Sequence, residues 1–380
     1  MKVVIACDSF KSCLSSNEVA KHLASGILQE NPNHQVISYA IGDGGEGTLE
    51  AFYETCHGKY IKVKTVDAYL KKIEAQYVLI DNDKTAVIEV AQIIGLAMYP
   101  REKRMPMYAS SYGVGLVLID AFKKGVTKII IGLGGSSTCD GGMGLLQALG
   151  AKFYDNKQNE LNPQAVNLEN IDRIDVENLY DFKGIELIAA CDVKNQLLGE
   201  SGATYVFGKQ KGLYPNQMKR IENGMHNYVN RMYQQTKIDL NACIGGGAAG
   251  GIGTALISML NAKMERGIEL LLSYSDIEDE IADCDLVITG EGQSDLQTKY
   301  GKVPVGILEI ATKYNKPVIC ISGALGLEYR SLYDLGFIGI YSIADRAMSF
   351  QQALDNAAPK LEATAYAIIK TIEAFRNEDN

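Results

Sequence analysis

The sequence lacks a long apolar run, a Cys-x-x-Cys pair and any stripe of basic residues. The first apolar run, Val3 to Cys7, is too short for the hydrophobic region of a signal peptide. No later run approaches the length that crosses a membrane. These absences exclude a membrane span and a membrane partner, so we expect a cytoplasmic protein.

The cysteines and histidines of the sequence also give little indication of a disulfide framework, a catalytic thiol or a zinc site. The eight cysteines have no regular spacing, so we expect reduced thiols. A catalytic thiol at Cys7, Cys139 or Cys191 is the alternative, but Cys7 and Cys191 end apolar strands, where cysteine behaves as a small buried hydrophobe. The four histidines lie outside the glycine-rich loops, which disfavours a zinc site or a histidine base.

Charge and length narrow the class of protein further. The net charge of −9 and the dispersed lysines argue against a nucleic-acid partner, which needs clustered Lys and Arg. An acidic protein can still bind an anionic substrate, because the charges of local loops decide binding. A chain of 380 residues with 47% hydrophobic residues is long enough for two domains.

Short apolar runs recur along the chain and end in turns that join glycine to a carboxylate. Helical patterns lie between these runs, so the sequence predicts an α/β fold with parallel strands. In such sheets, ligands bind outside the carboxyl ends of the strands. Backbone amides, carboxylates and a few lysines at that edge are the groups that phosphoryl transfer uses.

The expected strands are 2–7, 35–41, 60–66, 75–80, 86–90, 128–133, 185–191, 286–289, 317–321 and 337–342. The expected helices are 15–28, 48–56, 110–124, 143–149, 215–235, 248–260, 267–272, 303–314 and 350–375. We expect a surface loop over 155–181, and a cap from Ser110 or Ser111 at the start of the third helix.

Two loops near the start of the chain place acids beside lysine or glycine. In the first, Lys11 could neutralise a carboxylate or phosphate, although a solvated lysine with Asp8 as a turn former explains the segment equally well. The second, 42–48, has more glycine than a structural turn needs. There Asp43 fits a Mg²⁺ ligand, and Glu46 either binds the metal or caps the following helix.

The segment 132–142 combines glycines and hydroxyls in front of a helix. Amides and hydroxyls at a helix N-terminus form an anion cradle. We therefore predict phosphate binding by Gly134, Gly135, Ser136 and Ser137, with a plain strand-to-helix turn as the alternative. Asp140, in the same segment, is a second candidate ligand of Mg²⁺.

The segment 245–253 contains a formal G-x-G-x-x-G pattern, which is weak alone. The residues before it make a poor strand, and no clear ribose-binding acid follows. We interpret Gly246 and Gly247 as part of a phosphate- or adenine-facing loop and not as a dinucleotide fingerprint. A Walker sequence is absent, because Gly301-Lys302 has no glycine at the required upstream position.

Two further carboxylates and a lysine follow later strands. Asp192 comes directly after an apolar strand and could accept the proton of an attacking hydroxyl or hold a metal ion. Asp295 is the alternative group for orienting or deprotonating that hydroxyl. Lys302 stands just before a helix, where it could meet the developing phosphoryl charge, although a solvated lysine explains it equally well.

Six segments of the sequence stand in a characteristic order and extend nearly from end to end. They read DSFKSCLSS (8–16), DGGEGT (43–48), GLGGSSTCDGGMGLLQALG (132–150), ACDVKNQLLGESGATYVFGKQKG (190–212), GGGAAGGIG (245–253) and DLVITGEGQSDLQT…GKVP (285–304). Together they resemble the bacterial type I family of glycerate kinases.

This resemblance implies a kinase that uses ATP and Mg²⁺ to phosphorylate D-glycerate, giving 2-phosphoglycerate. It also implies two α/β domains: an outer flavodoxin-like domain of residues 1–66 and 285–380, and an inserted domain of residues 67–284. The active site would lie in the cleft between them. The expected site assigns catalysis to Asp192, Lys11 and Asp295, substrate binding to Asp8, Lys11 and Ser110, nucleotide or phosphate binding to Gly134, Gly135, Ser136, Ser137, Gly246, Gly247 and Lys302, and the metal to Asp43, Asp140 and Asp192.

The chain departs from the family pattern at Ser12, Gln293 and Tyr300, where the family usually has glycine, arginine and histidine. Loss of a guanidinium at position 293 would remove bidentate anion binding. Two other functions stay open. One is a metabolite sensor that binds without catalysis, and the other is a nicotinamide-dependent dehydrogenase suggested by residues 245–250.

Overall fold

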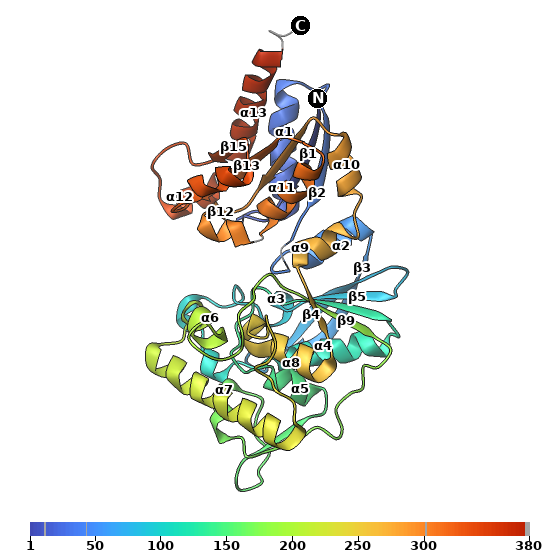
Figure 1. The fold of residues 1–380 in the computed structure, drawn as a ribbon, viewed down its shortest axis with the longest axis vertical. Coiled ribbons are helices and arrows are strands. Elements are labelled where there is room, and N and C mark those ends of the chain that lie inside the picture. Colours follow the sequence, from blue (N-terminus) through green and yellow to red (C-terminus); the bar gives the residue numbers. More distant parts are fainter. Residues whose placement is uncertain (11–12, 43, 301, 377–380) are drawn as a thin grey trace. The chain divides into compact units, whose positions relative to one another are not determined.

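The computed structural model describes residues 1–10, 13–42, 44–300 and 302–376, without the side chains of Gln297 and Tyr300. Contacts divide the chain into two compact units (Figure 1). Unit 1 comprises Met1–Asp43, Glu50–Cys56 and Ile268–Asn380, and unit 2 comprises Gly44–Leu49 and His57–Gly267. Unit 2 therefore interrupts the sequence of unit 1 twice, and its larger segment, His57–Gly267, is the main insertion.

Unit 1 is built on a five-stranded parallel sheet. Its strands are β1 (Lys2–Cys7), β2 (Gln35–Ala40), β11 (Leu286–Gly290), β13 (Val318–Ser322) and β15 (Gly339–Ser342), in the order β15-β13-β11-β1-β2. Counted along the unit, this is the 2-1-3-4-5 order of flavodoxin-like folds. All residues of β11 and β13 are buried, as expected for parallel strands covered on both faces.

The longest helices of unit 1 are α1 (Ser16–Glu30) and α13 (Ala357–Arg376), which pack against each other and share one apolar core with β1. A capping box starts α1, because the Ser15 hydroxyl accepts from the Glu18 amide and the Glu18 carboxylate accepts from the Ser15 amide. The other elements are α2 (Thr48–Cys56), α9 (Gly267–Leu272), α10 (Ile277–Asp283), α11 (Val303–Lys313), α12 (Phe350–Asp355), the short strands β12 (Gln293–Ser294) and β14 (Ala324–Leu325), and the 3-10 helices η5 (Leu296–Tyr300) and η6 (Tyr329–Leu335).

Unit 2 contains a six-stranded mixed sheet. Its strands are β3 (Lys59–Val66), β4 (Lys72–Ile80), β5 (Thr85–Glu89), β6 (Lys128–Gly132), β9 (Glu186–Ala190) and β10 (Lys263–Glu265). In the order β10-β9-β6-β5-β4-β3, the first four strands are parallel, and β4 runs antiparallel to both β5 and β3. A small antiparallel pair joins β7 (Lys152–Tyr154) to β8 (Arg173–Asp175).

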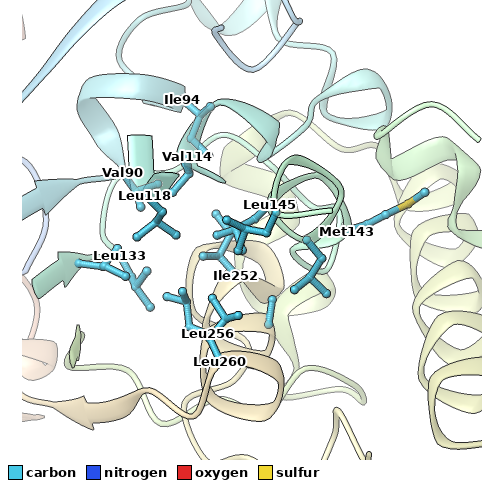
Figure 2. Close-up of a cluster of buried hydrophobic side chains, with 14 of the residues drawn as sticks. Val90, Ile94, Val114, Leu118, Leu133, Met143, Leu145, Ile252, Leu256 and Leu260 are labelled. Atoms are coloured by element: carbon cyan, nitrogen blue, oxygen red, sulfur yellow. The ribbon is translucent and has the colours of Figure 1, made fainter. Parts of the chain in front are cut away.

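The helices of unit 2 bury a second apolar core, part of which Figure 2 shows. Fully buried side chains of three helices, among them Leu118, Leu145 and Leu256, meet there. The helices are α3 (Ala91–Ile94), α4 (Tyr112–Lys123), α5 (Met143–Ala148), α6 (Ala203–Lys211), α7 (Pro215–Thr236) and α8 (Ile252–Leu260), with 3-10 helices η1 (Arg101–Lys103), η2 (Pro106–Tyr108), η3 (Ala165–Asn170) and η4 (Ala248–Gly251). None of the helices in the described part of the chain is long and apolar enough to span a bilayer.

The expected α/β architecture is confirmed, with a flavodoxin-like parallel sheet and an inserted mixed sheet. The border expected after residue 66 differs from the structure, because β3 pairs along its whole length with β4 in the sheet of unit 2. Likewise Ile268 and the residues after it group with unit 1 and not with the insertion. Both differences arise because long-range pairing decides where a strand or helix belongs.

Three local expectations also differ from the structure. The segment 155–181 is not one loop, since it contains η3 and β8. The closing helix is interrupted at Asn356, between α12 and α13. Of the two expected caps of α4, Ser111 does not cap the helix, because its hydroxyl donates to Asp140 and accepts from the Leu145 amide. The hydroxyl of Ser110, the other candidate, does accept from the Tyr112 amide at the start of the helix.

Candidate active site

A cavity of about 420 Å³ lies within unit 1 at the carboxyl ends of its parallel strands. Residues that follow four adjacent strands line it: Asp8 after β1, Glu291 after β11, Gly323 after β13 and Ile343 after β15. This is the edge at which open α/β sheets bind ligands. The sequence-predicted residues Asp8, Asp295 and Lys302 are all part of the lining.

Lys302 and Glu291 form an ion pair on the polar side of the cavity. The Lys302 ammonium lies 3.0 Å from Oε2 of Glu291, whose residue is only 4% exposed. The other carboxylate oxygen, Oε1, accepts from the hydroxyls of Thr298 at 2.6 Å and Ser294 at 3.1 Å. Because Glu291 is fixed by two hydroxyls, it positions Lys302, which is also the N-cap residue of α11. The carbonyl of Lys302 accepts from the amides of Val305 and Gly306, at 3.0 and 3.1 Å.

The two aspartates of the cavity have different surroundings. Asp8 is buried, and its Oδ1 accepts from the backbone amide of Ser9 at 2.7 Å. Asp295 follows β12, and its Oδ2 accepts from the side-chain amide of Gln293 at 3.0 Å. Lys11, expected beside Asp8, lies outside the described residues, as do Ser12 and Asp43.

Replacing Gln293 by arginine should be tolerated and should lower the KM of an anionic substrate by a few-fold. Gln293 is exposed and lines the cavity, so a guanidinium there can keep the bond to Asp295 and add a charge that attracts anions. Steady-state kinetics of Gln293→Arg against the parent chain measures this. A large loss of turnover would show that the loop is organised differently from what these contacts indicate.

In unit 2, Asp192 lies just beyond the carboxyl end of β9, as the sequence predicts. Its side chain is 17% exposed, and its Oδ1 lies 3.9 Å from Nε of Arg266, which follows the neighbouring parallel strand β10. A carboxylate beside an arginine at this edge can bind a metal ion or take a proton from a hydroxyl.

The predicted phosphate loop, 134–137, is occupied largely by contacts within the chain. The Gly134 amide donates to the carbonyl of Gly44 at 2.9 Å, and a Cβ on Gly134 would lie 2.4 Å from Cα of Gly45. Both the amide and the hydroxyl of Ser137 donate to the carbonyl of Ile94. The glycine at position 134 therefore allows two backbone segments to pass close to each other. Phosphate binding at Gly134 or Ser137 stays a prediction, and it would require these groups to exchange their present hydrogen bonds for bonds to a phosphate.

Sequence reasoning missed Lys211, the last residue of α6. It is 3% exposed, and its ammonium donates to Oγ of Ser136 at 3.1 Å and to the carbonyl of Thr138 at 2.7 Å. Burial lowers the pKa of this lysine. No local signal distinguishes it from the exposed Lys209 two residues earlier, so the sequence could not reveal that it supports the predicted phosphate loop.

Asp140 is fully buried and serves as an anchor. Its Oδ2 accepts from the amide and hydroxyl of Ser111, both at 2.7 Å, and from the Gly144 amide at 3.2 Å, while Oδ1 accepts from the Gly142 amide. Burial raises its pKa, and these hydrogen bonds oppose that rise. Binding Mg²⁺ through Asp140 would require several of these bonds to be given up.

Three other predicted site residues form hydrogen bonds within the chain. Ser110 is fully buried, and its hydroxyl accepts from the Tyr112 amide at the start of α4. The amides of Gly246 and Gly247 donate to the carbonyls of Cys243 and Asn195. No strand precedes these glycines, since residues 237–247 contain none, so the context of a dinucleotide fingerprint is missing. Their predicted ligand contacts stay untested.

Glu89, at the carboxyl end of β5, is a buried acid that the sequence did not single out. It is 1% exposed and accepts from the Leu49 amide at 2.9 Å and from the side chain of Gln92 at 3.4 Å. Burial raises the pKa of Glu89 to about 7, although these bonds and one from the Gly47 amide oppose the rise, and the charge of Glu46 adds to it. Glu89 is thus a carboxyl group that can be protonated near neutral pH.

The raised pKa of Glu89 predicts how stability depends on pH. Because folding favours the protonated carboxyl, its stabilising contribution is complete below the ordinary pKa near 4.5 and is lost as the pH rises through about 7. The loss amounts to at most about 3 kcal/mol. Urea unfolding at about pH 5 and about pH 8 should show a smaller difference for Glu89→Gln than for the parent chain, whereas equal differences would contradict the assignment.

The buried thiols fit the inert interpretation. Cys7 and Cys139 are buried, and burial raises the pKa of both thiols, which suppresses the thiolate needed for nucleophilic attack. Among the described residues, no group of three or more His, Cys, Asp and Glu side chains could hold a metal ion. A metal here would need oxygen ligands from a substrate, as Mg²⁺ commonly does in kinases.

Carboxylates and a positioned lysine at the carboxyl end of a parallel sheet are groups that phosphotransferases of small molecules use. The match to known proteins is more specific. Residues 3–373 fit the model described as "Glycerate kinase family", and the chain belongs to this family. It is thus a phosphotransferase with glycerate kinase activity, as the resemblance of its six segments implies.

Similar proteins cover almost the whole chain. The glycerate 2-kinase of Escherichia coli K12 is 39% identical over 361 residues, which is 94% of this chain and 95% of that protein. The glycerate kinase of Bacillus cereus ATCC 10987 is 37% identical over 366 residues, or 96% of each chain. A crystal structure from Salmonella typhimurium LT2, described as a candidate glycerate kinase 2, is 37% identical, superposes with a TM-score of 0.82 and covers 99% of both chains.

Proposed function

We propose that this chain transfers the γ-phosphoryl group of ATP to D-glycerate with the help of Mg²⁺, and that the product is 2-phosphoglycerate. The observation that carries the proposal is the family match over nearly the full length, with a relative from E. coli named glycerate 2-kinase. ATP and Mg²⁺ are the usual donor and metal of such phosphotransferases.

The polar side of the unit 1 cavity suits a phosphoryl group. The Lys302 ammonium and the positive end of the α11 dipole offer positive charge to developing phosphoryl oxygens. Glu291 keeps Lys302 in place, because its own second oxygen is held by Thr298 and Ser294. A donor group positioned before the reaction stabilises the transition state without further reorganisation.

The acids of the cavity fit a Mg²⁺ ion that is bound together with a nucleotide. Mg²⁺ in kinases takes one or two carboxylates and completes its shell with phosphate oxygens and water. Asp8 and Asp295 are the described aspartates of the cavity lining and would be its ligands there. When bound, the ion neutralises charge on the phosphates. Asp192 is proposed as the group that orients or deprotonates the attacking hydroxyl, or as a further ligand.

The proposal is tested by an assay coupled to ADP release with D-glycerate, L-glycerate or no acceptor. We expect turnover with D-glycerate at roughly 1–100 s⁻¹. A thermal-shift comparison should show stabilisation by Mg·ATP and none by NADH, because only a ligand of the folded state raises the midpoint. If ADP release were no faster with D-glycerate than without an acceptor, the proposed kinase would be contradicted and a metabolite sensor would be favoured. Stabilisation by NADH alone would favour a nicotinamide-dependent dehydrogenase.

A further inference from the structure

The cavity of unit 1 has a second, apolar side that glycerate does not require. Its polar side is formed by acids and Lys302, and its apolar side comes from the chain that runs from β15 through α12 into α13. The apolar lining includes Ile343, Met348, Phe350, Leu354 and Ala357. Glycerate carries a carboxylate and two hydroxyls on a short carbon chain, so it has almost no apolar surface to bury there.

Phe350 is the aromatic residue of this apolar side. It is 77% exposed although it lines the cavity, whereas Phe10, which also lines the cavity, is buried in the core. The start of α12 is nevertheless fixed, because the N-cap residue Ser349 forms a capping box with Gln352. A large ring held on a fixed helical turn and left open toward a cavity can gain contact area from a flat ligand.

The combination of the two sides matches a nucleotide. A nucleoside triphosphate has a flat base at one end and a chain of anionic phosphates at the other, and the cavity offers an aromatic, apolar side and a side with Lys302. A volume of about 420 Å³ lies within the range of sites for ligands of this size. In contrast, the amides of Gly246 and Gly247 in the loop predicted to face adenine are bonded to their own chain.

We propose that the nucleotide binds in this cavity, with its base against Phe350 and its phosphates toward Lys302 and the start of α11. This rests on the proposed function only for the choice of nucleotide as the phosphoryl donor. It assigns donor binding to the flavodoxin-like unit and makes Phe350 a binding residue.

The test compares Phe350→Ala and Phe350→Tyr with Phe375→Ala. Phe375 is a matched control, because it is 68% exposed near the end of α13 and does not line the cavity. Calorimetry with Mg·ADP in the absence of glycerate should show an affinity weaker by roughly 5- to 150-fold for Phe350→Ala, the range for loss of one aromatic–base contact. Phe350→Tyr and Phe375→Ala should bind as the parent chain does, and binding of inorganic tripolyphosphate should not respond to any of the three changes.

Steady-state kinetics separates this inference from the proposed function. Phe350→Ala should raise the KM for ATP and leave the KM for D-glycerate unchanged. Unchanged ADP affinity in Phe350→Ala would overturn the inference, and a raised KM for glycerate alone would assign the apolar side to the acceptor instead. A parent chain that binds Mg·ADP through Phe350 but does not phosphorylate glycerate would overturn the proposed function and leave the inference standing.

Discussion

Replacement of Asp192 by asparagine should lower kcat by about 10²- to 10⁴-fold, the contribution of a positioned acid or base, while ATP binding is retained. Asparagine keeps the shape of the side chain and removes the negative charge that a proton or a metal ion would need. Asp192 lies past the carboxyl end of β9 with Arg266 beside it, which is where a reacting group of an α/β sheet is expected. Initial rates and calorimetry with Mg·ATP measure the two parts of this prediction.

The matched control for this change is Asp181→Asn. Asp181 belongs to the same unit and is exposed, but it precedes β9, so the same chemical change there should leave kcat unaltered. If Asp192→Asn turned over at nearly the normal rate, Asp192 could be neither the base nor a required metal ligand. A change in the Mg²⁺ dependence of the remaining activity would favour the metal role over the base.

Replacement of Asp140 by alanine should destabilise the chain by several kcal/mol, because each buried donor left without an acceptor costs about 1–3 kcal/mol. The change leaves the donors of Ser111, Gly142 and Gly144 buried without an acceptor. Asp140→Asn should cost less, because it keeps one oxygen acceptor. The midpoint of urea unfolding measures the loss of global stability. Hydrogen exchange of the amides in α4 and α5 shows whether these two helices open more readily.

This experiment also separates the anchor from the metal ligand that the sequence suggested. An anchor loses stability on replacement, whatever the Mg²⁺ concentration. A variant with the stability of the parent chain but a raised requirement for Mg²⁺ would contradict the anchor and restore Asp140 as a ligand. The distinction matters because the glycines around Asp140 otherwise look like part of an anion site.

Much of the fold was predictable because buried parallel strands and capped helices have strong local signals. The strand Lys2–Cys7 and the helix Thr48–Cys56 have the expected bounds, and the capping residues Ser15 and Glu18 form the bonds that their spacing indicates. The sheet to which a strand belongs has no such signal. For β3, pairing with β4 decided the matter, and the sequence alone placed it on the wrong side of the border.

The candidate site was predictable in part for a similar reason. Asp8 directly follows an expected strand and Lys302 directly precedes an expected helix, so their position at the carboxyl edge of the sheet could be read from the sequence. Asp295 instead follows the short strand β12, which the sequence did not predict. Burial could not be read in this way. Gly134 is needed where its backbone passes close to that of Gly45, which is distant in sequence. Likewise, Lys211 is buried and Lys209 is exposed because of contacts with residues that are distant in sequence.

The most direct test of the central claim is to identify the phosphorylated carbon of the product. The chain is incubated with D-glycerate and Mg·ATP, and the product is examined by ³¹P and ¹³C NMR. A phosphorus coupled to the central methine carbon, in an amount equal to the ADP released, is the result that a glycerate 2-kinase gives. Phosphate on the terminal carbon would contradict the assignment of the product, and no phosphorylated glycerate at all would contradict the function.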